Sequence, residues 1–197
     1  EEHGTLLYTG DFKLRPSLAA EPCATPAAET LVMETTFGLP RYVFPPEAET
    51  IDRIVAFCQE AVAARATPVL LCYSLGKSQE VLRALTPARL PVMLHSETFR
   101  LTRICEQQGL EFPAYREFDA DLLPGHVVIC PPYSTGLLGR IPTPRTAAIT
   151  GWALDAGAIY RMRCDAAFPL SDHAGFDDLI RFVELVRPKR VLTLHGF

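Results

Sequence analysis

The stretch PVLLCYSLGKSQEVLRAL, residues 68–85, places a buried-type strand directly before a helix. Pro68–Tyr73 is a continuous apolar run of strand length, and Lys77–Leu85 has the pattern of a helix that begins just after Gly76. The Gly-Lys-Ser sequence is similar to the end of a phosphate-binding loop, but Leu71 stands where that loop needs its first glycine. The stretch therefore predicts a strand–turn–helix unit of a parallel sheet covered by helices.

The rest of the chain repeats this alternation of strands and helices. A helix is expected from Pro46 to Arg65, where a proline opens it, and an amphipathic helix is expected at Phe176–Val186. A further helix is expected at Glu97–Gln108. Such alternation predicts an α/β fold with largely parallel sheets. The other expected strands are Thr5–Thr9, Thr30–Met33, Pro91–Leu94, His126–Cys130, Ala147–Thr150 and Arg190–Leu194.

The composition is that of a folded globular chain, with 197 residues, 48% hydrophobic and 21% charged. Its apolar runs are shorter than a membrane span and its first residues do not form a signal peptide, so the sequence predicts no membrane association. The net charge of −4 excludes a histone-like basic coat but is compatible with a local nucleic-acid site. Six scattered cysteines, with no C-x-x-C pair, predict free thiols in a reducing cytoplasm.

The two ends of the chain interrupt this pattern. The sequence begins almost at once with an expected strand, and it stops at His195-Gly196-Phe197, directly after a buried-type strand and without a closing helix. A domain cut across its sheet has such ends. We therefore expect the chain to be a fragment of a longer protein.

Polar residues stand at the ends of three expected strands and before one helix, where α/β proteins gather their active sites. They are Asp11, Glu34, His173 and His195. Each has a structural alternative: Asp11 as a turn residue, Glu34 as the partner of an arginine, His173 as an incidental first-turn residue and His195 as an interior histidine. Together, two carboxylates and two histidines favour a metal or acid–base set.

Short motifs surround these four residues: YTGDF at 8–12, METTFG at 33–38, SDHA at 171–174 and LHG at 194–196. Their order, and the separations of 23, 139 and 22 residues between the four residues, resemble the β-CASP branch of the metallo-β-lactamase-fold nucleases. Residues 68–85 are similar to the strand–loop–helix of the β-CASP insert. The resemblance extends over nearly all of the chain.

The resemblance implies a role for each residue. Asp11 matches the aspartate that bridges two metal ions, and His195 matches the motif C histidine, a ligand of the second ion. Glu34 matches the motif A acid, which orients the motif B histidine, His173. That histidine faces the scissile phosphate and protonates the leaving oxygen. The family implies two divalent metal ions, with zinc as the first choice and manganese as the alternative.

The chain departs from the family in its metal ligands. The H-x-H-x-D-H motif is absent, and His3 does not stand where a further upstream ligand is expected. One bridging aspartate and one histidine are too few for two zinc ions. We therefore expect the amino-terminal half of the nuclease domain to be missing and the fragment alone to be inactive. The alternative is a degenerate, inactive paralogue.

The resemblance also implies a domain organisation. Residues 1–40 and 147–197 would form part of a metallo-β-lactamase αββα sandwich, and residues 45–146 would form the inserted β-CASP parallel-sheet domain. The active site is expected in the cleft between them. Candidates for phosphate contacts are Arg41, Arg140 and Arg161, for which a solvated surface position is the alternative.

Sequence context favours DNA over RNA. ETTFGLP at 34–40, CPP at 130–132 and FPLSDHA at 168–174 are similar to bacterial ligase-associated DNA exonucleases. We therefore predict a cytoplasmic DNA exonuclease of DNA repair, with DNA and a DNA ligase as partners. The alternatives are an RNA-processing nuclease similar to an mRNA 3′-end processing factor, and a non-catalytic β-CASP scaffold that binds nucleic acid or a nuclease partner. Trp152 and Tyr133 are interpreted as packing residues rather than base-stacking ones.

Overall fold

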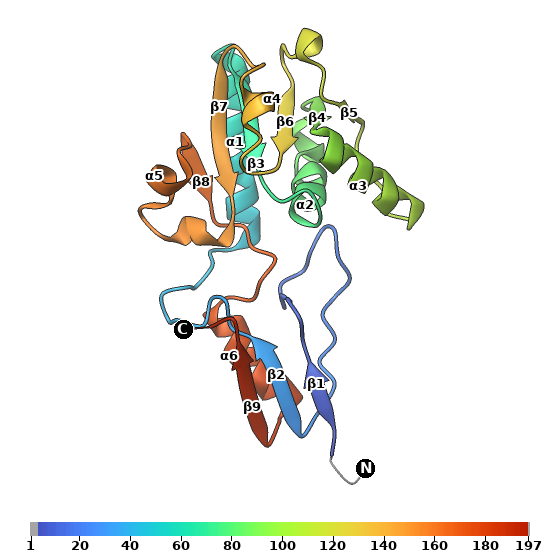
Figure 1. Cartoon of the computed structure of the whole chain (residues 1–197), viewed down its shortest axis with the longest axis vertical. Coiled ribbons are helices and arrows are strands. Elements are labelled where there is room, and N and C mark those ends of the chain that lie inside the picture. The colour runs from blue at the N-terminus through green and yellow to red at the C-terminus, as the bar shows by residue number, and fades with distance from the viewer. Residues whose placement is uncertain (1–3, 197) are drawn as a thin grey trace. The chain divides into compact units, whose positions relative to one another are not determined.

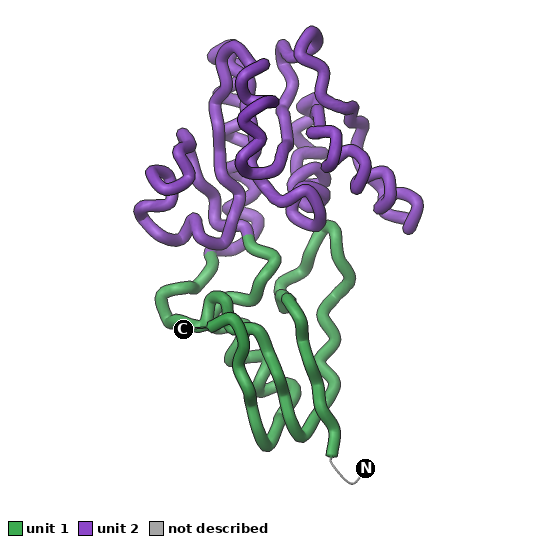
Figure 2. Tube along the Cα trace, viewed as in Figure 1, with its two compact units in different colours: residues 1–44, 171–197 green, residues 45–170 purple. Residues whose placement is uncertain are grey.

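Parallel strand pairing builds two separate sheets in the protein. The computed structural model describes residues 4–196, so His3 lies outside the described residues. Two compact units divide the chain (Figure 2): unit 1 comprises Glu1–Phe44 and Ser171–Phe197, and unit 2 comprises Pro45–Leu170. Unit 2 is therefore inserted into the sequence of unit 1.

The boundary after unit 2 differs from the sequence-based division. Strand β7 (Pro144–Ile149) pairs with β3 (Thr67–Leu71), and β8 (Ala166–Phe168) pairs with β7. These backbone hydrogen bonds tie both strands to the sheet of unit 2. Residues 147–170 consequently do not lie with the two ends of the chain, as that division expected. The assignment of the units to the metallo-β-lactamase and β-CASP domains stays a prediction.

Unit 1 is a three-stranded parallel sheet with a helix on one face (Figure 1). Strands β1 (Leu6–Tyr8), β2 (Thr30–Glu34) and β9 (Arg190–Leu194) run in the order β1-β2-β9, and the helix is α6 (Phe176–Val186). The apolar stripe of α6 packs on alternate residues of β2, as a half-buried sheet requires. The core of this unit is Phe12, Ala28, Leu31, Met33, Ala174, Leu179, Phe182 and Val186.

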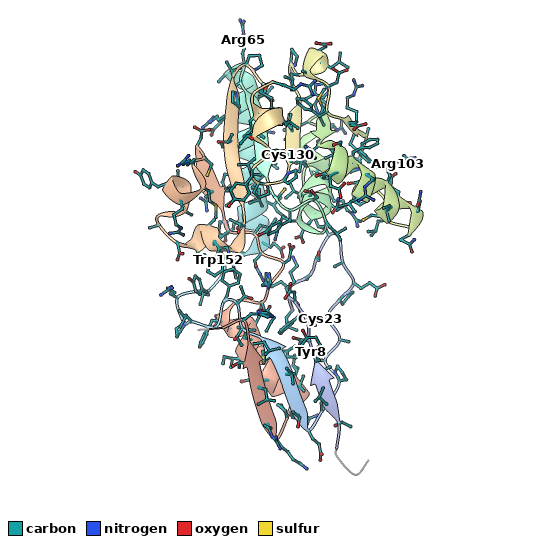
Figure 3. All side chains as sticks on the ribbon, in the orientation of Figure 1. Tyr8, Cys23, Arg65, Arg103, Cys130 and Trp152 are labelled. Carbon is teal, nitrogen blue, oxygen red and sulfur yellow. The ribbon has the colours of Figure 1, made fainter. Side chains whose placement is uncertain are left out.

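The other face of this sheet carries exposed apolar side chains. The strand register places Tyr8, Val32 and Leu192 next to one another, and Tyr8 (Figure 3) and Leu192 are 59% and 47% exposed. All five residues of β9 are exposed, although the sequence predicted a buried strand. Within the described residues, β9 lies at an edge of this sheet and pairs with β2.

Unit 2 is built on a six-stranded parallel sheet in the order β5-β4-β6-β3-β7-β8 (Figure 1). Helical turns of the 3-10 type lie at Thr86–Ala88, Ala120–Leu122 and Gly151–Leu154. The remaining strands are β4 (Val92–Leu94), β5 (Tyr115–Glu117) and β6 (Val127–Cys130), and the helices are α1 (Glu47–Ala63), α2 (Lys77–Ala84), α3 (Ser96–Gln107), α4 (Thr135–Leu138) and α5 (Ala158–Met162).

Both faces of this sheet are covered. Phe57 of α1 and Leu82 of α2 belong to the core on one face, and Leu137 of α4 belongs to the core on the other. This double cover explains why β6, which ends at Cys130 (Figure 3), is buried along its whole length. The six cysteines are free thiols, and burial raises the pKa of Cys58 to about 12. Among the described helices, none has the length and apolar character needed to cross a bilayer.

Candidate active site

Three of the predicted site residues lie at or just beyond the ends of neighbouring strands of unit 1. Glu34 is the last residue of β2, Asp11 lies three residues beyond the end of β1, and His195 follows β9 directly. Because the three strands are parallel and adjacent, all three residues lie at the carboxyl edge of one sheet. Gly10 turns the chain towards Asp11 with a positive φ of 58°.

His173 reaches this edge from the turn that precedes α6. Its Nδ1 lies 3.2 Å from Oε1 of Glu34 and 4.0 Å from Oδ1 of Asp11. The backbone of this turn is fixed on both sides, because the His173 amide donates to Oγ of Ser171 and the His173 carbonyl accepts from Nη2 of Arg15. The structure thus brings Asp11, Glu34 and His173 together from three separate segments.

Glu34 is held as a buried carboxylate. Its side chain is 2% exposed, and Oε2 accepts a hydrogen bond of 2.8 Å from the amide of Thr36. Burial alone would raise the pKa of Glu34, but the hydrogen bonds from His173 and Thr36 outweigh it and lower that pKa. A charged carboxylate is therefore fixed against the imidazole.

The pKa of His173 moves in the opposite direction. The hydrogen bond to Glu34 raises it, against the effect of burial, and the charges of Glu34, Asp11 and Asp172 raise it further. The imidazole is partly exposed, so it is accessible to a ligand. With Nδ1 directed at Glu34, Nε2 is the nitrogen left to exchange a proton with such a ligand.

In the metal-free protein we expect the His173 imidazole to titrate above its usual value of 6.5, and Glu34→Gln to return its pKa towards that value. The raised pKa means that the pairing stabilises the fold below the unfolded-state pKa and that this stabilisation is lost as the pH rises through the folded-state pKa. Proton NMR of the imidazole, recorded with a chelator present, measures the shift. Glu97→Gln, which removes an exposed carboxylate in unit 2, serves as the control; equal titration of His173 in the Glu34→Gln and wild-type proteins would contradict the pairing.

His195 is not joined to this cluster. Its backbone has a φ of 55°, its side chain is exposed, and within residues 4–196 it makes no hydrogen bond or ion pair with the other three residues. In the same part of the chain, no group of three or more His, Cys, Asp or Glu side chains is arranged to hold a metal ion. Asp11 and His195 are thus exposed donors that do not form the predicted two-metal centre by themselves.

The loop after β9 is fixed by contacts with the backbone and side chain of Thr35. The amide of Thr35 donates to the carbonyl of Leu194, and a Cβ at Gly196 would stand 2.1 Å from Oγ1 of Thr35. Only glycine fits at position 196 without a shift of this contact. The turn that carries His195 is therefore tied to the chain that follows Glu34.

Several residues that sequence reasoning missed support the cluster. The hydroxyl of Thr9 accepts from the amide of Glu34, and the ring of Phe37 meets the His173 ring edge-on at a centroid distance of 6.0 Å. Together with Thr36 and Ser171, they fix the two side chains that form the pair. All four stand within the short motifs, which was the available signal.

The predicted phosphate contacts are engaged in other interactions. The guanidinium of Arg41 donates to the hydroxyl of Tyr42, that of Arg140 lies 5.0 Å from the ring centre of Phe118, and that of Arg161 pairs with Asp155 at 3.0 Å. A phosphate would compete with the carboxylate for Arg161. Their role in binding nucleic acid stays a prediction.

Two tyrosines lie exposed at neighbouring strand ends of unit 2. Tyr133, expected to pack, is 93% exposed and follows β6, and Tyr73 is 69% exposed and follows β3. Strands β3 and β6 are paired, with Leu71 opposite Cys130. Tyr133 also has a positive φ of 71°, which is uncommon for a residue other than glycine.

Comparisons with known proteins decide the family. The chain is 64% identical, over its whole length, to a probable DNA ligase of Opitutus terrae. It is 25% identical over 95% of its length to the DNA cross-link repair 1A protein of Mus musculus, and 26% identical over 97% of its length to the 5' exonuclease Apollo of Rattus norvegicus. The chain is a β-CASP homologue. It spans 20%, 20% and 34% of these three proteins, respectively.

A solved structure supports the fold of this β-CASP homologue. A protein of unknown function from Enterococcus faecalis V583 matches 98% of the chain, and 53% of that protein, with a TM-score of 0.54 and 15% identity. No family model matches the sequence. The α/β fold with parallel sheets, as found in the β-CASP domain of metallo-β-lactamase-fold proteins, is confirmed.

Proposed function

We propose that the protein containing this β-CASP homologue is a nuclease that hydrolyses phosphodiester bonds of DNA in repair, with His173 as the general acid. The observation that carries the proposal is the 3.2 Å contact between Nδ1 of His173 and the buried Oε1 of Glu34. A carboxylate held against an imidazole favours the protonated ring, and a general acid must start protonated.

The chemistry of the proposed step follows from this geometry. Water attacks phosphorus and releases one proton to solvent, the bond from phosphorus to the leaving oxygen breaks, and Nε2 of His173 gives its proton to that oxygen. The imidazole is then neutral and regains a proton from solvent, while Glu34 keeps the ring oriented throughout.

Metal dependence is part of the proposal. When bound, divalent ions, zinc or manganese, supply positive charge next to the attacking water and the phosphate. Asp11 and His195 are the donors that this chain offers, and we propose that further ligands come from parts of the protein outside residues 1–197.

Two observations support DNA as the substrate: the names of the relatives and the exposed tyrosines of unit 2. The names of the similar proteins refer to a DNA ligase, DNA cross-link repair and a 5' exonuclease. Exposed rings at adjacent strand ends, Tyr73 and Tyr133, are suited to stacking on the bases of an unpaired strand. We therefore propose exonuclease action on single-stranded DNA, in association with a DNA ligase activity.

The experiment uses the intact protein with single-stranded DNA and RNA of matched sequence, each labelled at either end. Manganese or zinc is present, and a chelator stops parallel reactions. Faster, chelator-sensitive loss of DNA supports the proposal, and the first labelled product separates exonuclease from endonuclease action and gives the polarity. Faster cleavage of RNA would move the assignment to RNA processing. Binding of either strand without cleavage, in the presence of metal, would favour the scaffold alternative.

A further inference from the structure

A cavity of about 440 Å³ opens at the amino ends of three adjacent strands in unit 2. It is lined by the chain that enters β4, by the first residues of β5 and by His126, which immediately precedes β6. The register places Val92, Tyr115 and Val127 at one level across these strands. Since all strands of the sheet are parallel, this edge is opposite to the one that carries Tyr73 and Tyr133.

The charges of this cavity have one sign. Arg89 and Arg116 line it together with His126, whereas no aspartate or glutamate does. Within the described residues, neither guanidinium takes part in a hydrogen bond, an ion pair or a ring contact. Both side chains are exposed, so an anion can reach them from solvent. Two unpaired guanidiniums in one cavity of a chain with a net charge of −4 indicate a site for an anion.

The remainder of the cavity is apolar. Leu90, Pro91, Pro113 and Val92 supply aliphatic surface, and the ring of Tyr115 is held by an edge contact with Phe99 at 5.6 Å. A ligand that fills the cavity therefore combines an anionic group with a flat or apolar body. The planar guanidinium suits the oxygens of phosphate, with which it forms paired hydrogen bonds.

We propose that this cavity, the amino-edge pocket, binds a nucleoside monophosphate, with the phosphate on Arg89 and Arg116 and the base against Pro113 and Tyr115. Its volume falls within the range of small-ligand sites, which is about 300–1,000 Å³. The ligand is either a free nucleotide or the phosphorylated terminal nucleotide of a strand, since both present the same chemistry. The proposal does not rest on the proposed nuclease activity, because the pocket contains none of Asp11, Glu34, His173 and His195.

The test measures binding of thymidine 5′-monophosphate to the intact protein by titration calorimetry, with a chelator present to prevent hydrolysis. We expect saturable binding, about tenfold weaker in Arg116→Gln and in Arg89→Asn, and lost in the double variant. Thymidine, which lacks the phosphate, is expected to bind at least about tenfold more weakly. Asparagine is chosen at position 89 because the backbone there has a φ of 53°, a conformation that asparagine tolerates.

Arg163→Asn is the matched control. Arg163 has the same left-handed backbone, with a φ of 50°, and precedes β8, four strands away from β4 in the sheet. This variant is expected to bind the nucleotide as the wild type does. Equal affinity in the wild type and the double variant, or absence of saturable binding in the wild type, would overturn the proposal.

A 5′-phosphorylated oligothymidylate distinguishes the two sources of the ligand. If it competes with the free nucleotide and loses affinity in the double variant, the pocket binds a strand end. If the free nucleotide alone binds, the pocket is a nucleotide site. Both results support the amino-edge pocket. Neither experiment measures cleavage, so a failure of the nuclease proposal is distinguishable from a failure of the pocket proposal.

Discussion

Replacing His173 by alanine is expected to lower the rate of DNA cleavage by the intact protein by about 10²–10⁴-fold, the usual contribution of a general acid. The loss should fall on kcat, because the proton is needed only when the phosphorus–oxygen bond breaks. The fold should persist, since the imidazole is partly exposed and its neighbour Glu34 keeps the hydrogen bond from Thr36.

A substrate with a better leaving group makes this prediction specific. A p-nitrophenyl ester of thymidine 5′-monophosphate releases an anion that is stable without a proton, so the deficit of His173→Ala should shrink with it. His95→Asn is the matched control, because asparagine retains the capping hydrogen bond from the amide of Glu97 at the start of α3. A loss of equal size on both substrates would mean that His173 is not the acid.

Replacing Glu34 by glutamine is expected to lower kcat by about 10²-fold, within the range for a proton-transfer residue. Glutamine is similar in shape and its oxygen still accepts from Thr36, but it lacks the charge that raises the pKa of His173. Because Glu34 acts through His173, the double variant Glu34→Gln with His173→Ala should be no slower than His173→Ala alone.

The measurement is a double-mutant cycle on kcat, accompanied by thermal unfolding of each variant. Glu97→Gln again removes a carboxylate from an exposed pair, with Arg100, and should leave kcat unchanged. If the losses from the two substitutions multiplied, Glu34 would act on the reaction independently of His173. The fall of kcat at alkaline pH should also begin at lower pH in Glu34→Gln, since the acid loses its proton earlier.

Elements with a strong local pattern were predictable from sequence. The helix at Phe176–Val186 was predicted at the residues where it lies, and the unit at 68–85 forms β3 and α2 as expected. Strands β5 and β8 and helix α5 were not predicted, because three to five residues are too few to define a periodicity. Strands β5 and β8 are defined by their pairing with β4 and β7, which lie elsewhere in the sequence.

Strand pairing between distant segments determines which of the candidate site residues come together. Asp11, Glu34 and His173 were singled out by their positions at strand ends and before a helix, and the parallel order of β1 and β2 explains why they meet. The amino-edge pocket was not predictable, because Arg89 and Arg116 become neighbours only through the pairing of β4 with β5. The roles of the site residues stay predictions until cleavage is measured.

The insertion of unit 2 has a consequence for the order of folding. Strands β2 and β9 are paired although Thr35 and Leu194, which are hydrogen-bonded, lie 159 residues apart in sequence. In unit 2, however, the start and the end of the insert are close, since Phe168 contacts both Arg53 and Phe57 of α1. Unit 2 folded first would thus shorten the loop that unit 1 must close and remove about 1 kcal/mol of closure entropy. Pulse-labelled hydrogen exchange should find the amides of β3 protected before those of β9. On the ribosome, β2 would wait for its second partner strand, β9, until synthesis of the chain has passed residue 194.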